Sequence, residues 1–236
     1  MDITETAPIK TKKRKKKQPW QIVIKDRFLT NEKPENPYLV ALLYFFVFFM
    51  SFLLVFVCFF QLCDVRQESM MNTLNNGDCV LLLKEASSFK RGDIVVIQKE
   101  EEKHTKNIIK RIIGVSGDTL KFVIDSEKND GTVILFLKQS GSETFEIVDE
   151  PYIKEPMKKD KGFPSDFNFN EEIVVPEEHI FVMGDNRAVS EDSRGEDGAY
   201  PVASICGKSI MKIKKGSILE ILLRFLYPDR DKTFLH

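Results

Sequence analysis

A lysine inside an apolar run is the first residue of this sequence that suggests chemistry. Lys110 lies in the segment "IIKRIIGVSGD", residues 108–118. If this segment is a strand, the lysine side chain shares a face with Ile108 and Ile112. Burial among apolar groups lowers the pKa of a lysine by as much as several units, so that its amine can be neutral and accept a proton. We interpret Lys110 as a general base that is kept away from water.

Ser69 is the hydroxyl that such a base could activate. It lies in the segment "QESMMNTLNNGD", residues 67–78. A serine is a weak nucleophile until a neighbouring base takes its proton. Histidine is the usual base, but His104, His179 and His236 form no pattern that suggests one. A lone serine or a lone lysine indicates little, so the hypothesis depends on the segments around both.

The cysteines give no sign of a metal site, because they show neither a C-x-x-C motif nor metal-ligand spacing. Cys58 lies in an apolar run, where we expect it to pack. A disulfide between Cys63 and Cys79 is left open, since nothing in the sequence demands it. We expect no bound metal.

A long uncharged segment predicts a membrane anchor. No charged residue occurs between Pro37 and Cys63, and residues 39–60 alone would form a helix of about 33 Å, enough to cross a bilayer. A buried core helix would rarely be so apolar on every side, and the apolar core of a cleaved signal peptide is shorter. We therefore predict a retained transmembrane signal-anchor helix at residues 37–63.

Charge is distributed unevenly about this segment. Residues 1–63 carry ten Lys or Arg against five Asp or Glu, including the run "KTKKRKKK" at residues 10–17, whereas residues 64–236 carry 25 against 31. An acidic main part argues against a nucleic-acid-binding protein. Because positive residues stay on the cytoplasmic side, we expect residues 1–36 to be a basic cytoplasmic tail and the part after the anchor to be extracytoplasmic.

The part after the anchor predicts a mainly β domain at residues 64–216. Short β-rich segments are separated by turn signals, and "NDGT" near residue 130 predicts a hairpin. We expect a coiled antiparallel sheet or barrel-like catalytic domain, with a variable insert at about 120–178 and a surface loop at 154–172. The expected strands are 79–84, 93–99, 107–115, 119–125, 132–138, 145–149, 179–184 and 206–214.

The tail, residues 217–236, begins with an amphipathic pattern that is too short to span a membrane. Glu220 and Arg224 fall on one side of the predicted helix. Two positions for the tail stay open: packing on the domain or lying at the membrane surface. The other side of the helix carries Ile218, Ile221, Leu222 and Phe225.

Four segments, in order after the anchor, resemble the characteristic motifs of bacterial type I signal peptidases. Any one of them is weak, but the four in this order are a strong signal. The resemblance covers residues 39–208 and is greatest to the Gram-positive branch. A lysine at 110, where the endoplasmic-reticulum branch has histidine, fits the bacterial enzymes. The segments are "SMMNTL" (69–74), "RGDIVV" (91–96), "KRIIGVSGD" (110–118) and "MGDNRAVSEDSR" (183–194).

The resemblance implies roles for single residues. Ser69 would be the nucleophile and Lys110 the general base, while Ser190 would hydrogen-bond the Lys110 amine and fix its direction. Two structural ion pairs would support the site: Asp185 with Arg111, and Asp192 with Arg194.

The oxyanion of such a reaction needs hydrogen-bond donors. The Ser69 N–H would be the first, and the amide of Gln67, two positions earlier, a second, although family members often have a small or hydroxyl residue there. The family usually has proline where this chain has Asn72 and Ser116. Both prolines would stiffen a turn, so their absence leaves the loop geometry near the substrate cleft open but does not affect Ser69 and Lys110.

The resulting hypothesis is a membrane-bound endopeptidase that cleaves signal peptides from exported preproteins, with a preference for Ala-x-Ala before the cut and without a cofactor. Its partners would be preproteins, the lipid bilayer and the secretion machinery, and no nucleic acid. A soluble self-cleaving Ser–Lys protease is a rival that the anchor disfavours. A membrane-anchored β domain without catalysis, either an inactive relative or a binding module, is the main alternative.

Overall fold

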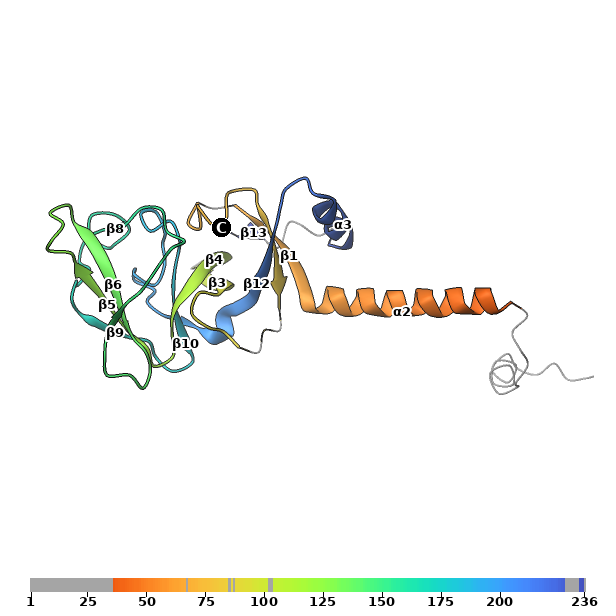
Figure 1. Ribbon diagram of the computed structural model, residues 1–236, viewed down its shortest axis with the longest axis horizontal. Helices are drawn as coiled ribbons and strands as arrows, with labels where there is room; N and C mark the ends of the chain where they lie inside the picture. Colours follow the sequence, from red (N-terminus) through yellow and green to blue (C-terminus); the bar gives the residue numbers. More distant parts are fainter. Residues whose placement is uncertain are drawn as a thin grey trace, which may run out of the picture. The chain divides into compact units, whose positions relative to one another are not determined.

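The computed structural model describes residues 36–66, 68–84, 86, 88–101, 104–227 and 234–235 (Figure 1). The chain divides into two units, residues 1–52 and 53–236. Most of the predicted basic tail, and Gln67, lie outside the described residues.

One helix, α2 (Pro37–Phe59), accounts for the uncharged segment. Its first turn is capped by Asn36, whose Oδ1 accepts hydrogen bonds from the N–H groups of Tyr38 and Leu39. None of its residues is buried and an 18-residue stretch within it has a mean hydropathy of 2.8, so its length and composition suit a membrane span. The predicted end at Cys63 was wrong, because residues 60–63 belong to a strand that pairs with Cys79–Leu83.

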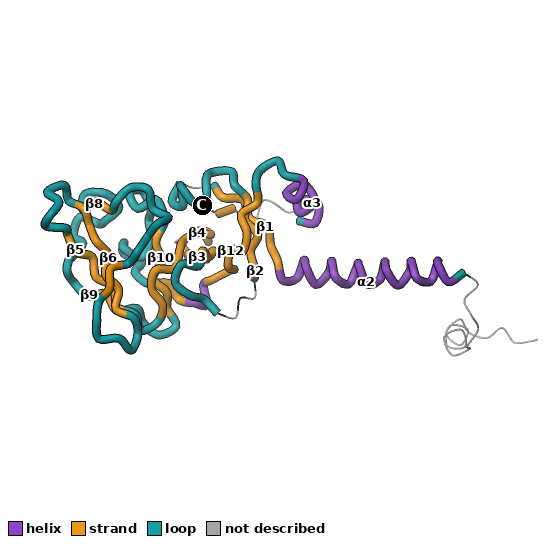
Figure 2. Tube along the Cα trace, viewed as in Figure 1, coloured by secondary structure: helices purple, strands orange, loops and turns teal. Residues whose placement is uncertain are grey.

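The larger sheet is a coiled, mainly antiparallel structure in which β3 pairs with both β12 and β4 (Figure 2). Its order is β11-β10-β4-β13-β1-β2-β12-β3. Only two residues of β13 join β1 to β4, so the sheet is not a closed barrel of continuous strands. This confirms the predicted fold class. The strands are β1 (Phe60–Val65), β2 (Cys79–Leu83), β3 (Ile94–Glu101), β4 (His104–Val115), β10 (His179–Met183), β11 (Tyr200–Pro201), β12 (Ile205–Ile213) and β13 (Phe234–Leu235).

The smaller sheet has the order β7-β6-β5-β9, with β8 also pairing with β6. The predicted hairpin at "NDGT" is confirmed, because β5 and β6 pair along their whole length and Gly131 takes a positive φ of 71° in the turn. The sheet lies within the predicted insert. Its strands are β5 (Thr119–Ile124), β6 (Thr132–Lys138), β7 (Glu146–Ile147), β8 (Met157–Lys158) and β9 (Glu172–Val174).

The segment predicted as a surface loop, residues 154–172, also contributes to a core. Phe163 and Phe167 each meet the buried ring of Phe122 edge to face, with ring centroids 5.5 Å apart, and Phe169 joins them. Aromatic pairs of this geometry stabilise beyond the area that they bury. The loop prediction missed this packing because isolated aromatic residues in a polar segment show no period.

The question of a Cys63–Cys79 disulfide is settled by the register of β1 and β2. Cys63 pairs with Val80, and Cys79 pairs with Asp64. This offset of one residue puts the two sulfur atoms in different buried clusters, and no disulfide joins them.

After β11 the chain continues through the short helix η1 (Val202–Ser204) into β12. The helix α3 (Ile218–Leu226) follows β12. The Ser217 Oγ caps α3 by accepting a hydrogen bond from the Glu220 N–H at 3.1 Å. The amphipathic pattern of the tail thus forms the predicted helix.

Candidate active site

Ser69 lies in a turn that follows β1. The turn is held by a hydrogen bond of 2.8 Å from the Leu74 N–H to the Met70 carbonyl, and both of these side chains are buried in one core cluster. Ser69 itself is 6% exposed. Its Oγ has no hydrogen-bond partner among the described residues. A buried hydroxyl without a partner is rare, and such groups often have a functional role.

Lys110 lies in the middle of β4 and is 1% exposed. Ile108 and Ile112 on the same face belong to one buried cluster, and the cross-strand neighbour on β3 is the buried Val95. Lys110 forms no hydrogen bond or ion pair with another described residue. The stem of the lysine therefore packs among apolar groups, while its amine faces a pocket that is partly lined by charged side chains.

Burial lowers the pKa of the Lys110 amine from 10.5 to about 8. The carboxylates of Asp192 and Glu191 oppose this change by raising the pKa. The cations of Lys106 and Arg194 lower it further. At a pH near 8, a substantial fraction of the amine is neutral and able to take a proton.

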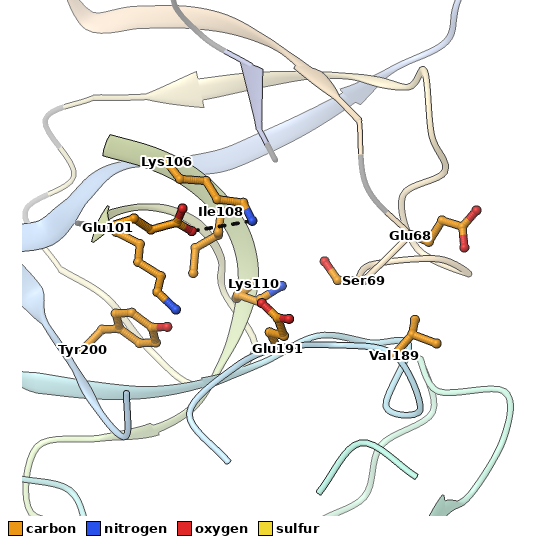
Figure 3. Close-up of a pocket in the computed structure, with 10 residues that line it drawn as sticks. Glu68, Ser69, Glu101, Lys106, Ile108, Lys110, Val189, Glu191 and Tyr200 are labelled. Carbon is orange, nitrogen blue, oxygen red and sulfur yellow. Dashed lines mark ion pairs between the residues drawn. The ribbon is translucent and has the colours of Figure 1, made fainter. Parts of the chain in front are cut away.

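Ser69 and Lys110 line the same pocket, whose volume is about 310 Å³. Figure 3 shows the Ser69 hydroxyl and the Lys110 amine pointing toward one another across it. No hydrogen bond joins them in this structure. The remaining lining is partly apolar and partly charged: Glu68, Lys99, Glu101, Lys106, Ile108, Val189, Glu191 and Tyr200.

Ser190 is brought to the same place but does not make the predicted contact. It is 6% exposed, and its Oγ makes no hydrogen bond of normal geometry, although its hydroxyl helps to lower the pKa of the neighbouring Asp192. The predicted hydrogen bond to Lys110 is therefore not formed here. The Ser190 hydroxyl instead lies above the bare Cα of Gly184, where a Cβ would overlap both this hydroxyl and the Ser69 carbonyl oxygen.

Two buried ion pairs flank the site. The Arg111 Nη2 lies 2.6 Å from the Asp185 Oδ2, and the Arg194 Nε lies 2.8 Å from the Asp192 Oδ1. Burial alone would raise the pKa of Asp192, but the neighbouring Arg194 holds it below its ordinary value. The Asp192 Oδ2 also accepts the Gly184 N–H at 2.9 Å, which fixes the turn beside Ser190.

Four contacts that the sequence did not predict complete the site. The Asn186 N–H donates to the Ser69 carbonyl at 2.9 Å, and its side-chain amide donates to the Glu68 carbonyl at 3.1 Å. Arg187 binds the Gly184 carbonyl at 3.0 Å and forms a buried ion pair with Glu150. The "MGDNR" segment was a signal for Gly184 and Asn186, whereas Glu150 stands in no recognisable motif.

The positions that depart from the family pattern have clear conformations. Asn72 has a φ of 96°, which proline, fixed near −65°, cannot adopt. The Ser116 hydroxyl donates to the His179 carbonyl at 3.2 Å, a bond that proline could not make. Both turns are therefore built for the residues present. Gln67, the suggested oxyanion donor, lies outside the described residues.

Within the described part of the chain, no group of three His, Cys, Asp or Glu side chains could hold a metal ion.

A known protein family matches most of this sequence. The family, described as "Signal peptidase, peptidase S26", matches residues 38–213. The chain belongs to this signal peptidase family. The family prediction from the four segments is thus confirmed, and with it the prediction that the chain is an enzyme, a peptidase.

Relatives of the chain carry the same name. It is 38% identical over 149 residues to "Signal peptidase I P" of Bacillus subtilis subsp. natto, covering 61% of this chain and 71% of that protein. It is 37% identical over 150 residues to "Signal peptidase I" of Bacillus amyloliquefaciens, with the same coverage of 61% and 71%. A crystal structure of a signal peptidase I from Enterococcus faecalis V583 is similar over 54% of this chain and 100% of that one, with a TM-score of 0.34 and 22% identity. Together with the apolar helix α2, the family makes the chain a membrane-associated peptidase.

Proposed function

We propose that this signal peptidase removes signal peptides from exported preproteins, with Ser69 as nucleophile and Lys110 as general base. The observation that carries the proposal is the buried Lys110 amine, with a pKa of about 8, facing the Ser69 hydroxyl in one pocket. A hydroxyl and a desolvated amine in this arrangement are the two groups that acyl transfer needs.

The reaction follows from these two groups. Lys110 takes the Ser69 proton as the Oγ attacks the scissile carbonyl, and the resulting ammonium gives a proton to the leaving amine. Water then attacks the acyl-enzyme while Lys110 again acts as base. The Ser69 N–H, which has no hydrogen-bond acceptor among the described residues, is the first donor that we propose for the oxyanion. The amide of Gln67 remains the second proposed donor.

Ser190 is proposed to orient Lys110 once substrate fills the pocket. Its hydroxyl is buried, makes no hydrogen bond of normal geometry, and lies near the Ser69 carbonyl. A hydroxyl can accept from an ammonium or donate to a neutral amine, so it can stay bonded through the proton transfer. Asp192 and Arg194 hold the turn that carries it.

Membrane attachment is proposed to help catalysis. The lysine run of residues 10–17 would hold the N-terminus in the cytoplasm, so that the peptidase unit is extracytoplasmic. A preprotein whose apolar segment is still in the same bilayer would meet Ser69 at a high effective concentration. Its cleavage site would bind as an extended strand with small side chains before the cut, and the secretion machinery would deliver it.

A Ser69→Ala variant tests the proposal directly. The full chain, reconstituted in lipid vesicles, should cleave a preprotein at least about 10³-fold more slowly than wild type, because the nucleophile is gone. Ser142→Ala, which changes an exposed serine, is the matched control and should cleave at the wild-type rate. A Ser69→Ala protein that cleaves normally would refute the assignment, and a wild-type protein that cleaves no preprotein would favour a non-catalytic membrane-anchored domain.

A further inference from the structure

The helix α3 is amphipathic in the opposite sense to a helix that packs on a soluble domain. Most of its large apolar side chains point outward, and only Leu223 is buried: Phe225 is 86% exposed and Ile218 is 78% exposed. Ile221 and Leu222 are exposed as well, whereas Glu220 is buried. A surface helix in water normally turns its apolar face to the core and its charges to solvent.

The polar side of α3 faces the domain and is held there by a network of ionic contacts. The Glu220 Oε1 lies 2.6 Å from Arg224, and the Glu220 carboxylate also accepts the Gly216 N–H. Arg224 in turn binds Asp64 on β1 at 2.9 Å. Figure 1 shows α3 next to β1. These contacts fix the rotation of the helix, so the apolar side has to face away from the domain.

The position of α3 next to the end of α2 indicates what its apolar side contacts. Leu223 packs in a cluster with Phe56 and Phe60, and the Tyr227 hydroxyl donates to the Phe60 carbonyl at 2.9 Å. Phe56 lies in the last turn of α2 and Phe60 is the first residue after it. A helix of 23 residues extends about 35 Å, so if α2 spans the bilayer, these two phenylalanines lie at the level at which the chain leaves it. The helix α3 is held at the same level.

Charge near α3 favours lipid over protein as the occupant. Lys214 and Lys215 are exposed, lie just before the helix, and form no ion pair with another described residue. Basic residues flanking an apolar helix face suit an anionic headgroup layer. A second copy of this chain would bring the same lysines together, which like charges oppose.

We propose that the outward face of α3 inserts into the interfacial layer of the bilayer that α2 crosses. The occupant is lipid, with anionic headgroups near Lys214 and Lys215 and acyl chains against Phe225 and Ile221. This gives residues 53–236 a membrane contact of their own beside the anchor. The inference depends on α2 being a membrane span and is independent of the chemistry of Ser69.

Fluorescence quenching by brominated lipids tests the inference. The full chain contains one tryptophan, Trp20. In a Trp20→Phe, Ser69→Ala background, Phe225→Trp gives one reporter on α3, and Ile147→Trp gives a matched control on β7, where Ile147 is 63% exposed. Both proteins are reconstituted in vesicles that contain anionic lipid brominated near the headgroup end of the acyl chain.

We expect at least twofold quenching of the Phe225→Trp protein, a blue-shifted emission, and less than a tenth of that quenching for the Ile147→Trp protein. Equal, weak quenching of both would overturn the proposal. A third outcome would also overturn the proposal in favour of contact between copies. In it, the emission is not quenched, and its blue shift increases with the protein-to-lipid ratio. Because the background lacks Ser69, neither result depends on the proposed catalysis.

Discussion

The strand β4 carries two adjacent cations whose surroundings are opposite. Lys110 faces a pocket with Ser69, and neither side chain makes a hydrogen bond to a described residue. Arg111, one residue further, binds Asp185 through two nitrogen atoms and lies 4.0 Å over the ring of Tyr152. One step along a strand reverses the face, so a single segment supplies both environments.

The difference shows how this chain separates chemistry from support. Arginine stays protonated at every working pH and makes forked hydrogen bonds, which suits the ion-paired side. Lysine changes its pKa readily when buried, which suits the pocket side. The ion-paired side is fully bonded and holds the turns. The pocket side keeps the Ser69 hydroxyl and the Lys110 amine free of hydrogen bonds to described residues. Such free groups are available to bind a substrate and to transfer protons.

The largest effect is expected from Lys110→Met, which removes the base and its buried charge. Cleavage should fall at least about 10³-fold. The folded pKa of Lys110 is about 8 and its ordinary value is 10.5, so below pH 8 the charged amine destabilises the fold by about 3 kcal/mol. We therefore expect the variant to be more stable than wild type by up to that amount at pH 7, as measured by urea unfolding.

The same linkage gives a pH dependence for wild type. Between pH 8 and 10.5 the unfolded chain binds more protons at this lysine than the folded one, so its contribution to stability rises with pH. The difference between wild type and Lys110→Met should shrink over that range. A variant that is less stable than wild type at pH 7 would contradict the account of a strained, buried amine.

On the ion-paired side, Arg194→Met should have the opposite effect on stability. Asp192 would be left buried and unpaired, which typically costs about 3 to 5 kcal/mol. The double variant Asp192→Asn, Arg194→Met should recover part of this loss, because no charge remains unpaired. If Arg194→Met unfolds at the same urea concentration as wild type, the two sides do not differ in the way described.

Gly184 lies between the pocket side, with Ser69 and Ser190, and the ion-paired side, where Asp192 accepts its N–H. Gly184→Ala should therefore disturb both sides. Its Cβ would overlap the Ser69 carbonyl and the Ser190 hydroxyl, so we expect a loss of about 1 to 3 kcal/mol in stability and at least tenfold in kcat/KM. Gly195→Ala is the control, since its Cβ would come no closer than 3.4 Å to the Asp192 carbonyl. Equal behaviour of the two alanine variants would argue against a close approach at Gly184.

The smallest effect is expected from removing single charges at the pocket rim, which should shift the pH dependence of kcat/KM. The direction of the shift is the test. Lys106 lowers the pKa of Lys110 and Glu191 raises it. Lys106→Gln should therefore shift the acidic limb of the pH–kcat/KM profile to higher pH, and Glu191→Gln should shift it to lower pH. Each shift should be on the order of half a pH unit. Shifts in the same direction would mean that the limb does not report Lys110.

Sequence alone predicted the parts of this site that depend on local periodicity. Alternation put Lys110 on the face of Ile108 and Ile112, and turn signals located most strands. It could not show that Lys110 meets Ser69, which is 41 positions away and on another element. It also could not separate the end of α2 from β1, because the first residues of β1, Phe60 to Cys63, carry no charge and continue the uncharged segment.

Other features depend on partners far along the chain. The Asn186 N–H reaches the Ser69 carbonyl, and Arg224 reaches Asp64, 160 positions apart. The direction in which α3 faces follows from that second pair and not from the helical pattern, which fits either orientation. Such contacts are properties of the folded chain.

The pH dependence of preprotein cleavage by the wild-type chain in lipid vesicles tests the central claim most directly. In the free enzyme, kcat/KM should increase about tenfold per pH unit below the pKa of the base and level off above about pH 8, because only the neutral Lys110 amine can take the Ser69 proton. A profile that is flat from pH 6 to about 9, or that keeps rising to about pH 10.5, the ordinary pKa of a solvated lysine, would contradict it.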